Sequence, residues 1–518
     1  MGKRKSITKS AHPAIRNDSF PALQVHPTPL EKIGKKDAVR ASYFDSDIQP
    51  NPEHPATNDQ SLFPTTDSNL MPKSASLSVL PPAQWLGPQS CAPDVQDVIQ
   101  FLTDQGTFHL PSLPNGLFSA AAGTHPDFEL TGYHNVWLRD NIHVAWSLWD
   151  RQRDPHRAVC CIQALLQFYR SQQPRLKSLI DRSADPSIVH NRPHIRFDGP
   201  RLSELEEKWP HAQNDALGYF LWLTALMLRS NALPMETADW ETLTLLIHYF
   251  ETIRVWEDED SGHWEENRKV AASSIGCVCA GLQALSQLLA DQPHTTTLLA
   301  ATSHPVSTEQ LRRLLKLCRD SLQSILPWEC RQTDPLKSRA HDAALLFLLY
   351  PLDQVDDAAA EEKILHDIHQ HLAGHIGIRR YNGDSYWCND YRKQFTPELR
   401  SSDFSEDIAS RDRLLNPGFE AQWCLFDPIL ACIYGRRYQQ SGRTEELEKQ
   451  LTAVQRSLAQ LTRPSDRFPP FRCPESWFCE NGEWIPNDIT PLLWTQGNLI
   501  QALDSLKESL QSRADRNA

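Results

Sequence analysis

Two helical patterns alternate along the chain from about residue 93 onward. In six segments, apolar residues return every three or four positions and charged residues fill the opposite face, as in helices at a protein surface. These segments are residues 93–104, 155–171, 238–255, 308–325, 358–371 and 444–460. In six others, apolar or small residues occupy nearly all sides: residues 139–150, 213–229, 270–290, 340–350, 419–436 and 490–506. A helix without a polar face must be buried all round, so the second set predicts inner helices.

The alternation of outer and inner patterns predicts six helical hairpins that close into a ring. The predicted fold is therefore all-α, an (α/α)6 barrel over residues 91–518 with one helix of each hairpin inside. An open α-solenoid also stacks helix pairs. It fits less well, because the chain has no fixed repeat period and the inner segments lack a polar concave face.

Residues 1–90 follow neither pattern. They hold twelve prolines and few large apolar residues outside short clusters. Such a composition buries too little apolar surface to offset the entropy of ordering the chain. We expect a Pro-rich, disordered leader.

The net charge and the cysteine spacing disfavour several classes of binding partner. The formal net charge is -13, which disfavours nucleic acid and anionic membranes as partners, because both bind basic surfaces. The twelve cysteines show no CxxC spacing and no histidines at metal-ligand intervals, so we expect reduced thiols, no metal and no cofactor. The basic N-terminus is not followed by an apolar signal segment, and residues 270–290 are too polar for an ordinary membrane span. We expect a cytoplasmic protein.

Acids, amides and tryptophans recur where the inner segments begin. A single acid at a helix start is most often a cap or a partner of the helix dipole. Five such groups, on inner helices that run in parallel, would instead converge at one mouth of the barrel. The chain holds fifteen tryptophans, whose flat rings suit stacking on sugars as well as core packing. The predicted pocket residues are Trp137, Arg139 and Asp140; Gln213 and Asp215; Trp264, Glu265 and Glu266; Asp342; and Glu420 and Trp423.

Several short motifs in this order resemble a known family. They are WLRD (137–140), QND (213–215), HWEE (263–266), RRYNGD (379–384), FEAQW (419–423), CPESW (473–477) and TPLLWTQGNL (490–499). Over roughly residues 90–510 they resemble the catalytic domain of glycoside hydrolase family 15, the glucoamylase family. The segments 136–141 and 264–276 also resemble the barrel of the α and β regulatory subunits of phosphorylase kinase.

The resemblance implies roles for two adjacent carboxylates and for two sugar-contacting pairs. By position, Glu265 matches the family's general acid and Glu266 a neighbouring substrate-binding carboxylate. Arg139 and Asp140 match the pair that grips the terminal sugar. A further sugar-contacting pair corresponds to Arg380 and Tyr381.

For the general base, the family places a glutamate some twenty residues before a tryptophan of the last inner helix. Glu475 fits this position relative to Trp494, and Glu480 and Glu483 lie close enough to remain alternatives. An inverting glycosidase needs one protonated and one ionised carboxyl, roughly 6.5–9.5 Å apart. The charge of Glu266 and the apolar ring of Trp264 would both raise the pKa of Glu265, as an acid requires.

Two features complicate this site. Arg268 and Lys269 directly follow the acid pair, and cations near Glu265 would lower its pKa unless they point away. The long loop 384–418, which carries Tyr386, Trp387, Tyr391 and Phe404, offers a segment that closes over the pocket and limits which chains enter.

The family resemblance implies an inverting, exo-acting hydrolase that releases glucose from malto- or isomalto-oligosaccharides. The alternative is a sugar-binding regulatory protein without catalysis, as the kinase subunits suggest. A third option, an inverting phosphorylase, would leave Glu475 without a task. The predicted partner is an oligosaccharide in each case.

Overall fold

The computed structural model describes residues 77, 80–123 and 128–517. Most of the predicted leader lies outside these residues. Its last part, residues 80–90, packs on the barrel: Trp85 is buried, and its ring lies 5.3 Å from that of Phe101 and 5.8 Å from that of Phe471. The packed chain therefore begins before the predicted boundary at residue 90.

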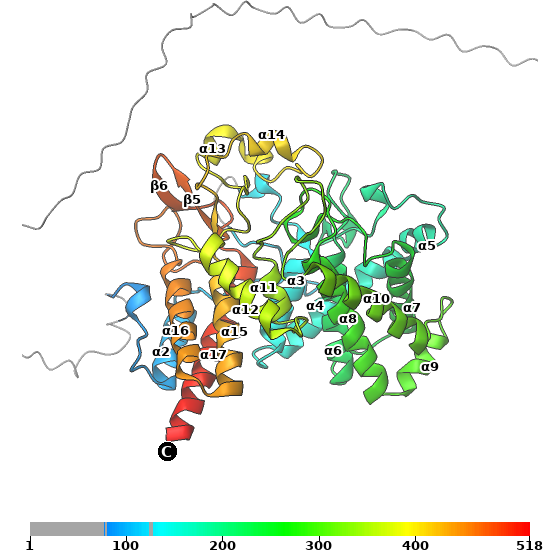
Figure 1. Cartoon of the computed structure of the whole chain (residues 1–518), viewed down its shortest axis with the longest axis horizontal. Helices are drawn as coiled ribbons and strands as arrows, with labels where there is room; N and C mark the ends of the chain where they lie inside the picture. Colours follow the sequence, from blue (N-terminus) through cyan, green and yellow to red (C-terminus); the bar gives the residue numbers. More distant parts are fainter. Residues whose placement is uncertain (1–76, 78–79, 124–127, 518) are drawn as a thin grey trace, which may run out of the picture. The chain divides into compact units, whose positions relative to one another are not determined.

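Six inner helices, labelled in Figure 1, contact one another in a closed ring. They are α3 (Leu138–Trp149), α6 (Asn214–Arg229), α8 (Ala272–Asp291), α11 (Leu345–Leu349), α15 (Phe426–Ser441) and α17 (Leu493–Asn517). Each contacts the next, and α17 returns to contact α3. This contact between the last and the first inner helix closes the barrel, confirms the (α/α)6 fold and excludes an open solenoid.

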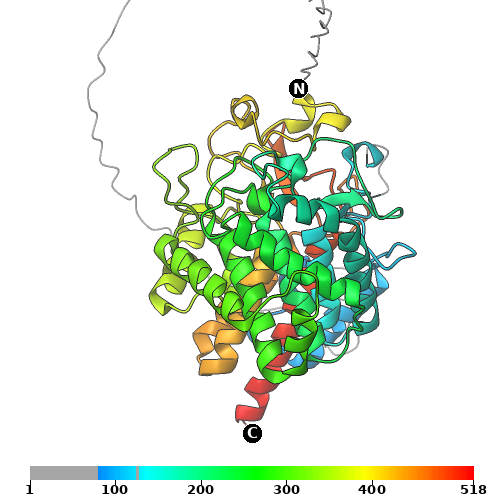
Figure 2. The same cartoon turned by 90° about the vertical axis from the view of Figure 1, so that its right-hand side faces the viewer.

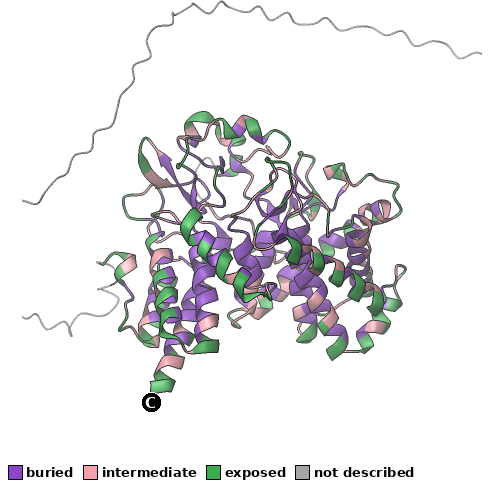
Figure 3. Ribbon diagram, in the orientation of Figure 1, coloured by how far each residue is buried: buried purple, intermediate pink, exposed green. Residues whose placement is uncertain are grey.

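Six outer helices cover the ring. They are α2 (Ala92–Asp104), α4 (Pro155–Ser171), α7 (Thr237–Thr252), α10 (Thr308–Ile325), α12 (Ala358–Asp367) and α16 (Thr444–Ala459). In α10, for example, Leu311, Leu314, Leu315, Cys318 and Leu322 are buried at helical spacing. Figure 3 shows the result: the inner helices are purple, and the outer helices turn green faces outward.

Small residues let the inner helices approach closely. A Cβ on Gly218 would lie 2.5 Å from the backbone of Cys277, and one on Gly276 would lie 2.3 Å from the Leu348 side chain. The segment 270–290 is small-faced for this reason. Among the described residues, α8 alone is long and apolar enough to cross a membrane, and 83% of that stretch is buried inside the barrel.

Two small antiparallel sheets stand at one end of the barrel. The first contains β1 (Val136–Trp137), β2 (Arg196–Asp198) and β3 (Ser203–Glu204), and the second β4 (Gln422–Trp423), β5 (Ser476–Glu480) and β6 (Glu483–Pro486). Trp137 pairs with Arg196, and Trp423 pairs with Ser476. The sheets thereby fix the backbone directly before α3, before α15 and after Glu475.

Short helices fill the connections. They are η1 (Pro82–Gln84), η2 (Glu129–Thr131), α5 (Gln173–Ile180), η3 (Val189–Asn191), η4 (Gly262–Trp264), α9 (His294–Ala300), η5 (Ile368–Leu372), α13 (Tyr391–Gln394), η6 (Pro397–Leu399) and α14 (Ile408–Asp412). In Figures 1 and 2, the yellow segment with α13 and α14 lies at the end of the barrel opposite the C-terminus of α17.

Two inner helices start at least five residues later than the sequence predicts. The fourth was predicted from residue 340 but begins at Leu345, because Ala343 bonds through its backbone to Arg380. The fifth was predicted from residue 419 but begins at Phe426, because Gln422 and Trp423 pair as a strand with β5. At the other end of the chain, α17 continues to Asn517, beyond the predicted residue 506.

Candidate active site

A pocket opens at the mouth where the inner helices begin, with about 750 Å³ of empty space counted together with its open side. It is lined by Tyr133, Trp137, Asp140, Trp209, Pro210, His263, Trp264, Glu265, Arg380, Tyr386, Ser401, Ser402, Asp403, Phe404, Arg411, Trp423, Glu475, Leu492 and Trp494. Its mixture of aromatic and polar side chains is typical of a small-molecule site.

The structure brings seven of the predicted site residues to this pocket and places seven behind it. The lining residues are Trp137, Asp140, Trp264, Glu265, Arg380, Trp423 and Glu475. The residues behind the wall are Arg139, Gln213, Asp215, Glu266, Asp342, Tyr381 and Glu420. Several of the second set hold lining residues in place: Arg139 and Gln213 bond to Glu265, Glu266 to Arg380, and Asp342 to Trp264.

One wall is built around the buried side chain of Arg139 in the first turn of α3. Its guanidinium donates to Asp215 Oδ2 at 2.6 Å, to Gln213 Oε1 at 3.2 Å and to Glu265 Oε1 at 3.4 Å. Next to it, burial raises the pKa of Asp140 to about 7, although the positive charge of Arg139 opposes the shift. In this wall, three carboxyl groups, those of Asp140, Asp215 and Glu265, surround the single cation of Arg139.

Glu265 ends η4 in a left-handed backbone conformation, with φ of 59°. Such a conformation is uncommon outside glycine and gathers at functional sites. The carboxyl accepts from Gln213 Nε2 at 3.1 Å, and its side chain keeps 19% of its surface exposed toward the pocket. Burial raises the pKa of Glu265, against the opposing effect of Arg139 and of the Gln213 hydrogen bond.

Glu266 points the other way, out of the pocket. It accepts from Arg411 Nη2 at 2.6 Å, from Arg380 Nη2 at 3.0 Å and from the hydroxyl of Tyr381. Arg339 lies 3.9 Å away. Burial acts to raise its pKa, but the three arginines hold the pKa of Glu266 at about 2.

The cause predicted for the raised pKa of Glu265 is therefore wrong in part. The charge of Glu266 is balanced by arginines, and burial is the main cause of the shift. The side chains of Arg268 and Lys269, which could have lowered the pKa of Glu265, make their contacts with other groups. Arg268 donates to backbone oxygens of Glu259 and Ser187, and Lys269 is buried among other charges.

The rings of Trp264 and Trp423 form an aromatic side of the pocket. Their centroids lie 6.0 Å apart. The indole N–H of Trp264 donates to Asp342 Oδ1 at 2.8 Å, which fixes the ring so that its face lines the pocket. Among the described residues, the buried Nε1 atoms of Trp423 and Trp494 have no hydrogen-bond acceptor, so they are available to a ligand.

Glu475 directly precedes β5, and it is buried. Its Oε1 accepts from the Tyr133 hydroxyl at 2.9 Å, and its Oε2 accepts from Asn487 Nδ2 at 2.6 Å. Burial raises the pKa of Glu475 to about 8, and these two hydrogen bonds oppose the shift. Of the three candidate bases, Glu475 alone lines the pocket; Glu480 pairs with Arg392 and Glu483 is exposed.

A second tyrosine extends this network. The hydroxyls of Tyr133 and Tyr386 lie 2.9 Å apart. A hydroxyl has one hydrogen to donate. Because Tyr133 donates to Glu475, Tyr386 must donate to Tyr133. The Tyr386–Tyr133–Glu475 chain thus connects the 384–418 segment to a carboxylate of the pocket.

Sequence reasoning missed about half of the lining residues. Tyr133 and Trp209 precede the motifs WLRD and QND by a few positions, and their aromatic rings beside those motifs were a usable signal. The lining residues Ser401, Ser402 and Asp403 gave no signal, because such residues are ordinary in loops.

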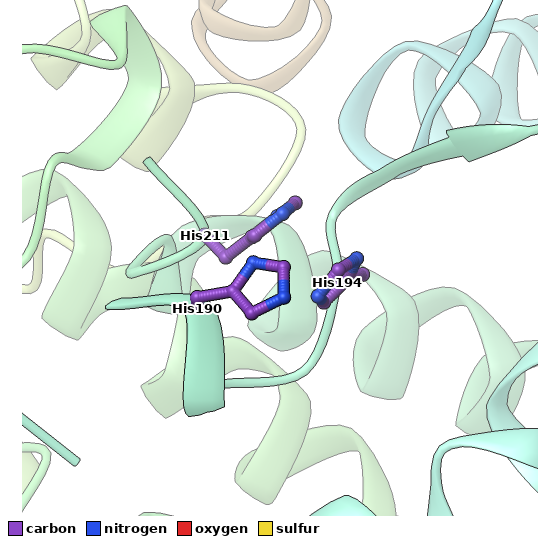
Figure 4. A group of neighbouring side chains, drawn as sticks. All are labelled: His190, His194 and His211. Atoms are coloured by element: carbon purple, nitrogen blue, oxygen red, sulfur yellow. The ribbon is translucent and has the colours of Figure 1, made fainter. Parts of the chain in front are cut away.

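Two groups of side chains in the described part of the chain have the composition of a metal site. In the first, nitrogens of His190, His194 and His211 lie within 4.8 Å of one another (Figure 4). However, the rings of His194 and His211 stack with centroids 3.8 Å apart, so their in-plane lone pairs do not converge. Nδ1 of His211 also accepts from the backbone N–H of Ile195, which leaves the proton of the neutral ring on Nε2.

The second group, His341, Asp367 and His371, is no better suited to a metal. Its two imidazoles stack with centroids 4.1 Å apart, and Lys363 already pairs with the carboxylate of Asp367. We therefore assign neither group to a metal.

Comparison with known proteins agrees with this geometry. Residues 108–405 match the family described as glycosyl hydrolases family 15. A wild-type glycosidase superposes with a TM-score of 0.57 at 17% identity, over 81% of this chain and 99% of the other. Glucoamylase from Saccharomycopsis fibuligera superposes with a TM-score of 0.52 at 14% identity, over 84% and 100%.

Two further relatives are similar in sequence. The probable phosphorylase b kinase regulatory subunit alpha of Caenorhabditis elegans is 26% identical over 278 residues, which cover 49% of this chain but only 21% of that subunit. The uncharacterized lipoprotein YgeQ of Escherichia coli is 28% identical over 191 residues, or 32% of this chain and 70% of that protein.

The family match spans more than half of the chain, and the barrel is the fold shared with the glucoamylase and the glycosidase. This chain belongs to the glycosyl hydrolases family 15.

Proposed function

We propose that the protein is an inverting, exo-acting glycoside hydrolase that releases glucose from the non-reducing ends of α-glucosidic oligosaccharides. One observation carries the proposal: two carboxyl groups from separate segments, Glu265 after η4 and Glu475 before β5, line one aromatic pocket. This is the pair of groups that glycoside hydrolysis requires.

In the proposed reaction, Glu265 is the general acid. It gives its proton to the glycosidic oxygen as the bond from that oxygen to the anomeric carbon breaks. Its raised pKa keeps it protonated beyond the ordinary range of a glutamate, and its exposed oxygen faces the pocket. Arg139 and Gln213 hold the carboxyl in place from behind.

Glu475 is the proposed general base. It takes a proton from a water molecule whose oxygen bonds to the anomeric carbon, so an α-linked substrate gives β-glucose. The base must be ionised to act. Hydrogen bonds from Tyr133 and Asn487 stabilise its carboxylate form.

The terminal glucose would be held by Asp140 and by the rings of Trp137 and Trp423. A carboxyl accepts hydrogen bonds from vicinal hydroxyls, and aromatic faces pack on the apolar face of a sugar. A variant of the structurally similar glycosidase was solved in complex with glucose, which supports a glucosyl ligand for this fold.

Proton NMR during the first minutes of turnover tests the mechanism. Wild-type protein with maltose or isomaltose should first yield β-glucose; α-glucose as first product would contradict Glu475 as a base. Glu265→Gln should slow hydrolysis by about 10²- to 10⁴-fold, with partial relief on substrates that carry good leaving groups. Glu475→Gln should abolish turnover without relief. The exposed Glu483→Gln, close to Glu475 in sequence, is the control and should keep full activity.

A second function is favoured by the similarity to a kinase regulatory subunit. In this alternative the pocket binds a glucoside but does not cleave it. Calorimetry with maltose or acarbose separates the two: binding without glucose release between pH 4 and pH 9 supports the regulatory function, and release supports the hydrolase. Absence of binding to any glucoside contradicts both.

A further inference from the structure

The 384–418 segment crosses the mouth of the pocket and is held on several sides. Arg411 bonds to Glu266 at 2.6 Å. At a second place, Arg400 bonds to Asp488 at 2.6 Å. The helix η6 of the segment also contacts η2, and Lys208 pairs with Glu406 at 2.5 Å. These partners come from four different stretches of the chain, so the segment bridges the mouth.

The strongest of these attachments is the one to Glu266. Its carboxylate is buried and is shared by Arg411 of the segment and by Arg380 and Arg339 of the barrel wall. The Nε atom of Arg411 also donates to Ser385 Oγ at 2.9 Å, which ties one end of the segment to the other. The oxygens of Glu266 are occupied by these partners, so Glu266 fixes the segment and does not face the pocket.

The segment brings unused polar atoms to the pocket. Ser401 Oγ and Asp403 Oδ2 are buried and have no hydrogen-bond partner among the described residues, and both residues line the pocket together with Phe404. The other oxygen of Asp403 accepts from the backbone N–H of Ser405 at 2.8 Å, which fixes the carboxylate. Buried polar atoms without a partner are costly, and hydroxyl groups of a sugar would satisfy them.

The unpartnered atoms of Ser401 and Asp403 lie where the sugar of the leaving group would be bound. Asp140, which is proposed to bind the terminal glucose, lies at the start of α3 in the barrel wall. The 384–418 segment, with α13 and α14, lies at the end of the barrel opposite the C-terminus of α17, and its residues Ser401, Asp403 and Phe404 line the pocket. A sugar linked to the terminal glucose extends outward past Glu265 and meets the segment.

We propose that the 384–418 segment forms the binding site for the leaving-group sugar and restricts the substrate to short α-glucosides of two or three units. Asp403 and Ser401 bind hydroxyls of that sugar, and Glu266 is a positioning residue that acts through Arg411. This inference rests on the proposed hydrolase function. A longer chain would have to displace a segment that is anchored on several sides.

The test compares hydrolysis of the malto- and isomalto-series from two to seven units by wild-type protein, Arg411→Ala and Arg413→Ala. Arg413 is the matched control: it lies two residues further on, is exposed, and its Nε bonds only to the carbonyl of Ala409. We expect wild-type kcat/KM to be highest for two or three units. Arg411→Ala should raise the ratio of kcat/KM for seven units over two by about tenfold or more, the effect of one lost polar contact on specificity. Arg413→Ala should leave the ratio unchanged.

Asp403→Ala is the second variant and does not disturb the anchor. It should raise the Kd for a disaccharide about tenfold and leave the Kd for glucose unchanged, because glucose occupies only the inner position. A wild-type kcat/KM that rises with chain length, or an unchanged ratio in Arg411→Ala, overturns the proposal. So does an equal loss of glucose and disaccharide affinity in Asp403→Ala.

Failure of the hydrolase function gives a different result. In that case wild-type protein releases no glucose from any member of either series. The Kd values of the same oligosaccharides then decide the role of the segment. Tighter binding of two or three units than of seven supports it, and tighter binding of seven units overturns it.

Discussion

Glu265 and Glu266 are adjacent in sequence, yet their side chains lie in regions of opposite charge balance. Around Glu265, one arginine serves three carboxyl groups, those of Asp140, Asp215 and Glu265 itself. Around Glu266, three arginines converge on one carboxylate. The left-handed turn at Glu265 sends the two side chains in different directions.

The comparison shows that the surroundings set the protonation of each carboxyl. Both glutamates lose water on folding, and this loss alone raises a carboxyl pKa. Beside a single shared arginine, the pKa of Glu265 stays raised. Among three arginines, the pKa of Glu266 falls to about 2. The first environment suits a proton donor, and the second suits a permanent charge that binds structure together.

The largest predicted effect is a loss of stability when the charge of Glu266 is removed. Glu266→Gln leaves Arg339, Arg380 and Arg411 without their common carboxylate, and removing one partner of a buried ion pair costs about 3–5 kcal/mol. We expect that loss of unfolding free energy in urea, followed by tryptophan fluorescence. Glu265→Gln is the control: it keeps an amide oxygen toward Arg139, which retains the carboxylate of Asp215 as its closer partner, so the variant should stay within about 1 kcal/mol of wild type. Equal stability of the two variants would contradict the assigned difference.

The next prediction concerns the carboxylate across the pocket. Tyr133→Phe removes a hydrogen bond to the ionised form of Glu475, and hydrogen bonds to charged groups contribute about 1.5–3 kcal/mol. The pKa of Glu475, already raised to about 8, should rise by about one to two units. The limb of the pH profile of kcat/KM at which the base ionises should then move to higher pH. A loss of activity at every pH without a shift would contradict this role.

Asp140 has a raised pKa like Glu265, and its predicted role is to bind the sugar. Asp140→Ala should weaken binding of maltose or acarbose by about 1–3 kcal/mol, because ligand hydroxyls lose an acceptor. Calorimetry measures this directly. Asp104→Ala, on the exposed end of α2, is the control and should bind as wild type does. Unchanged affinity in Asp140→Ala would place the terminal sugar elsewhere.

Much of the barrel could be predicted from the sequence because each inner helix is apolar or small-faced on nearly all sides. The segment 270–290 is one example, and α8 occupies Ala272–Asp291. The shifted starts of α11 and α15 could not be predicted, since they depend on pairing with distant strands and loops. The pattern of apolar and polar residues within a segment does not indicate which distant segments it will pair with.

The site was predictable where a charged residue lies in the first turn of an inner helix, as Asp140 does, or in the loop shortly before one, as Glu265 does. It was not predictable that Glu266 lies behind the wall, because this depends on a backbone angle at Glu265 and on Arg411, 145 residues away. Nor did any local pattern indicate that Asp403 lines the pocket.

The smallest predicted effect is on how the free energy of unfolding changes with pH. In four buried carboxyls the pKa is raised into the neutral range: to about 7 in Asp140 and Asp260, and to about 8 in Glu329 and Glu475. A carboxyl whose pKa is higher in the folded state holds its proton longer than in the unfolded chain. Its contribution to stability is complete below its unfolded pKa and is lost as pH rises through its folded pKa.

Between pH 6.5 and 8 these groups should therefore lower the stability as pH rises. Glu266, with a folded pKa of about 2 and an acidic pKa in the unfolded chain, has finished titrating below this window in both states. Glu475→Gln removes one of the four, so its stability should fall less steeply than that of wild type, by about 1 kcal/mol per pH unit. Urea unfolding at pH 6.5 and 8 measures the difference, with Glu483→Gln as the exposed control that should follow wild type. If Glu475→Gln also follows wild type, Glu475 is ionised throughout this range, and the pocket keeps its base charged at a lower pH than its burial indicates.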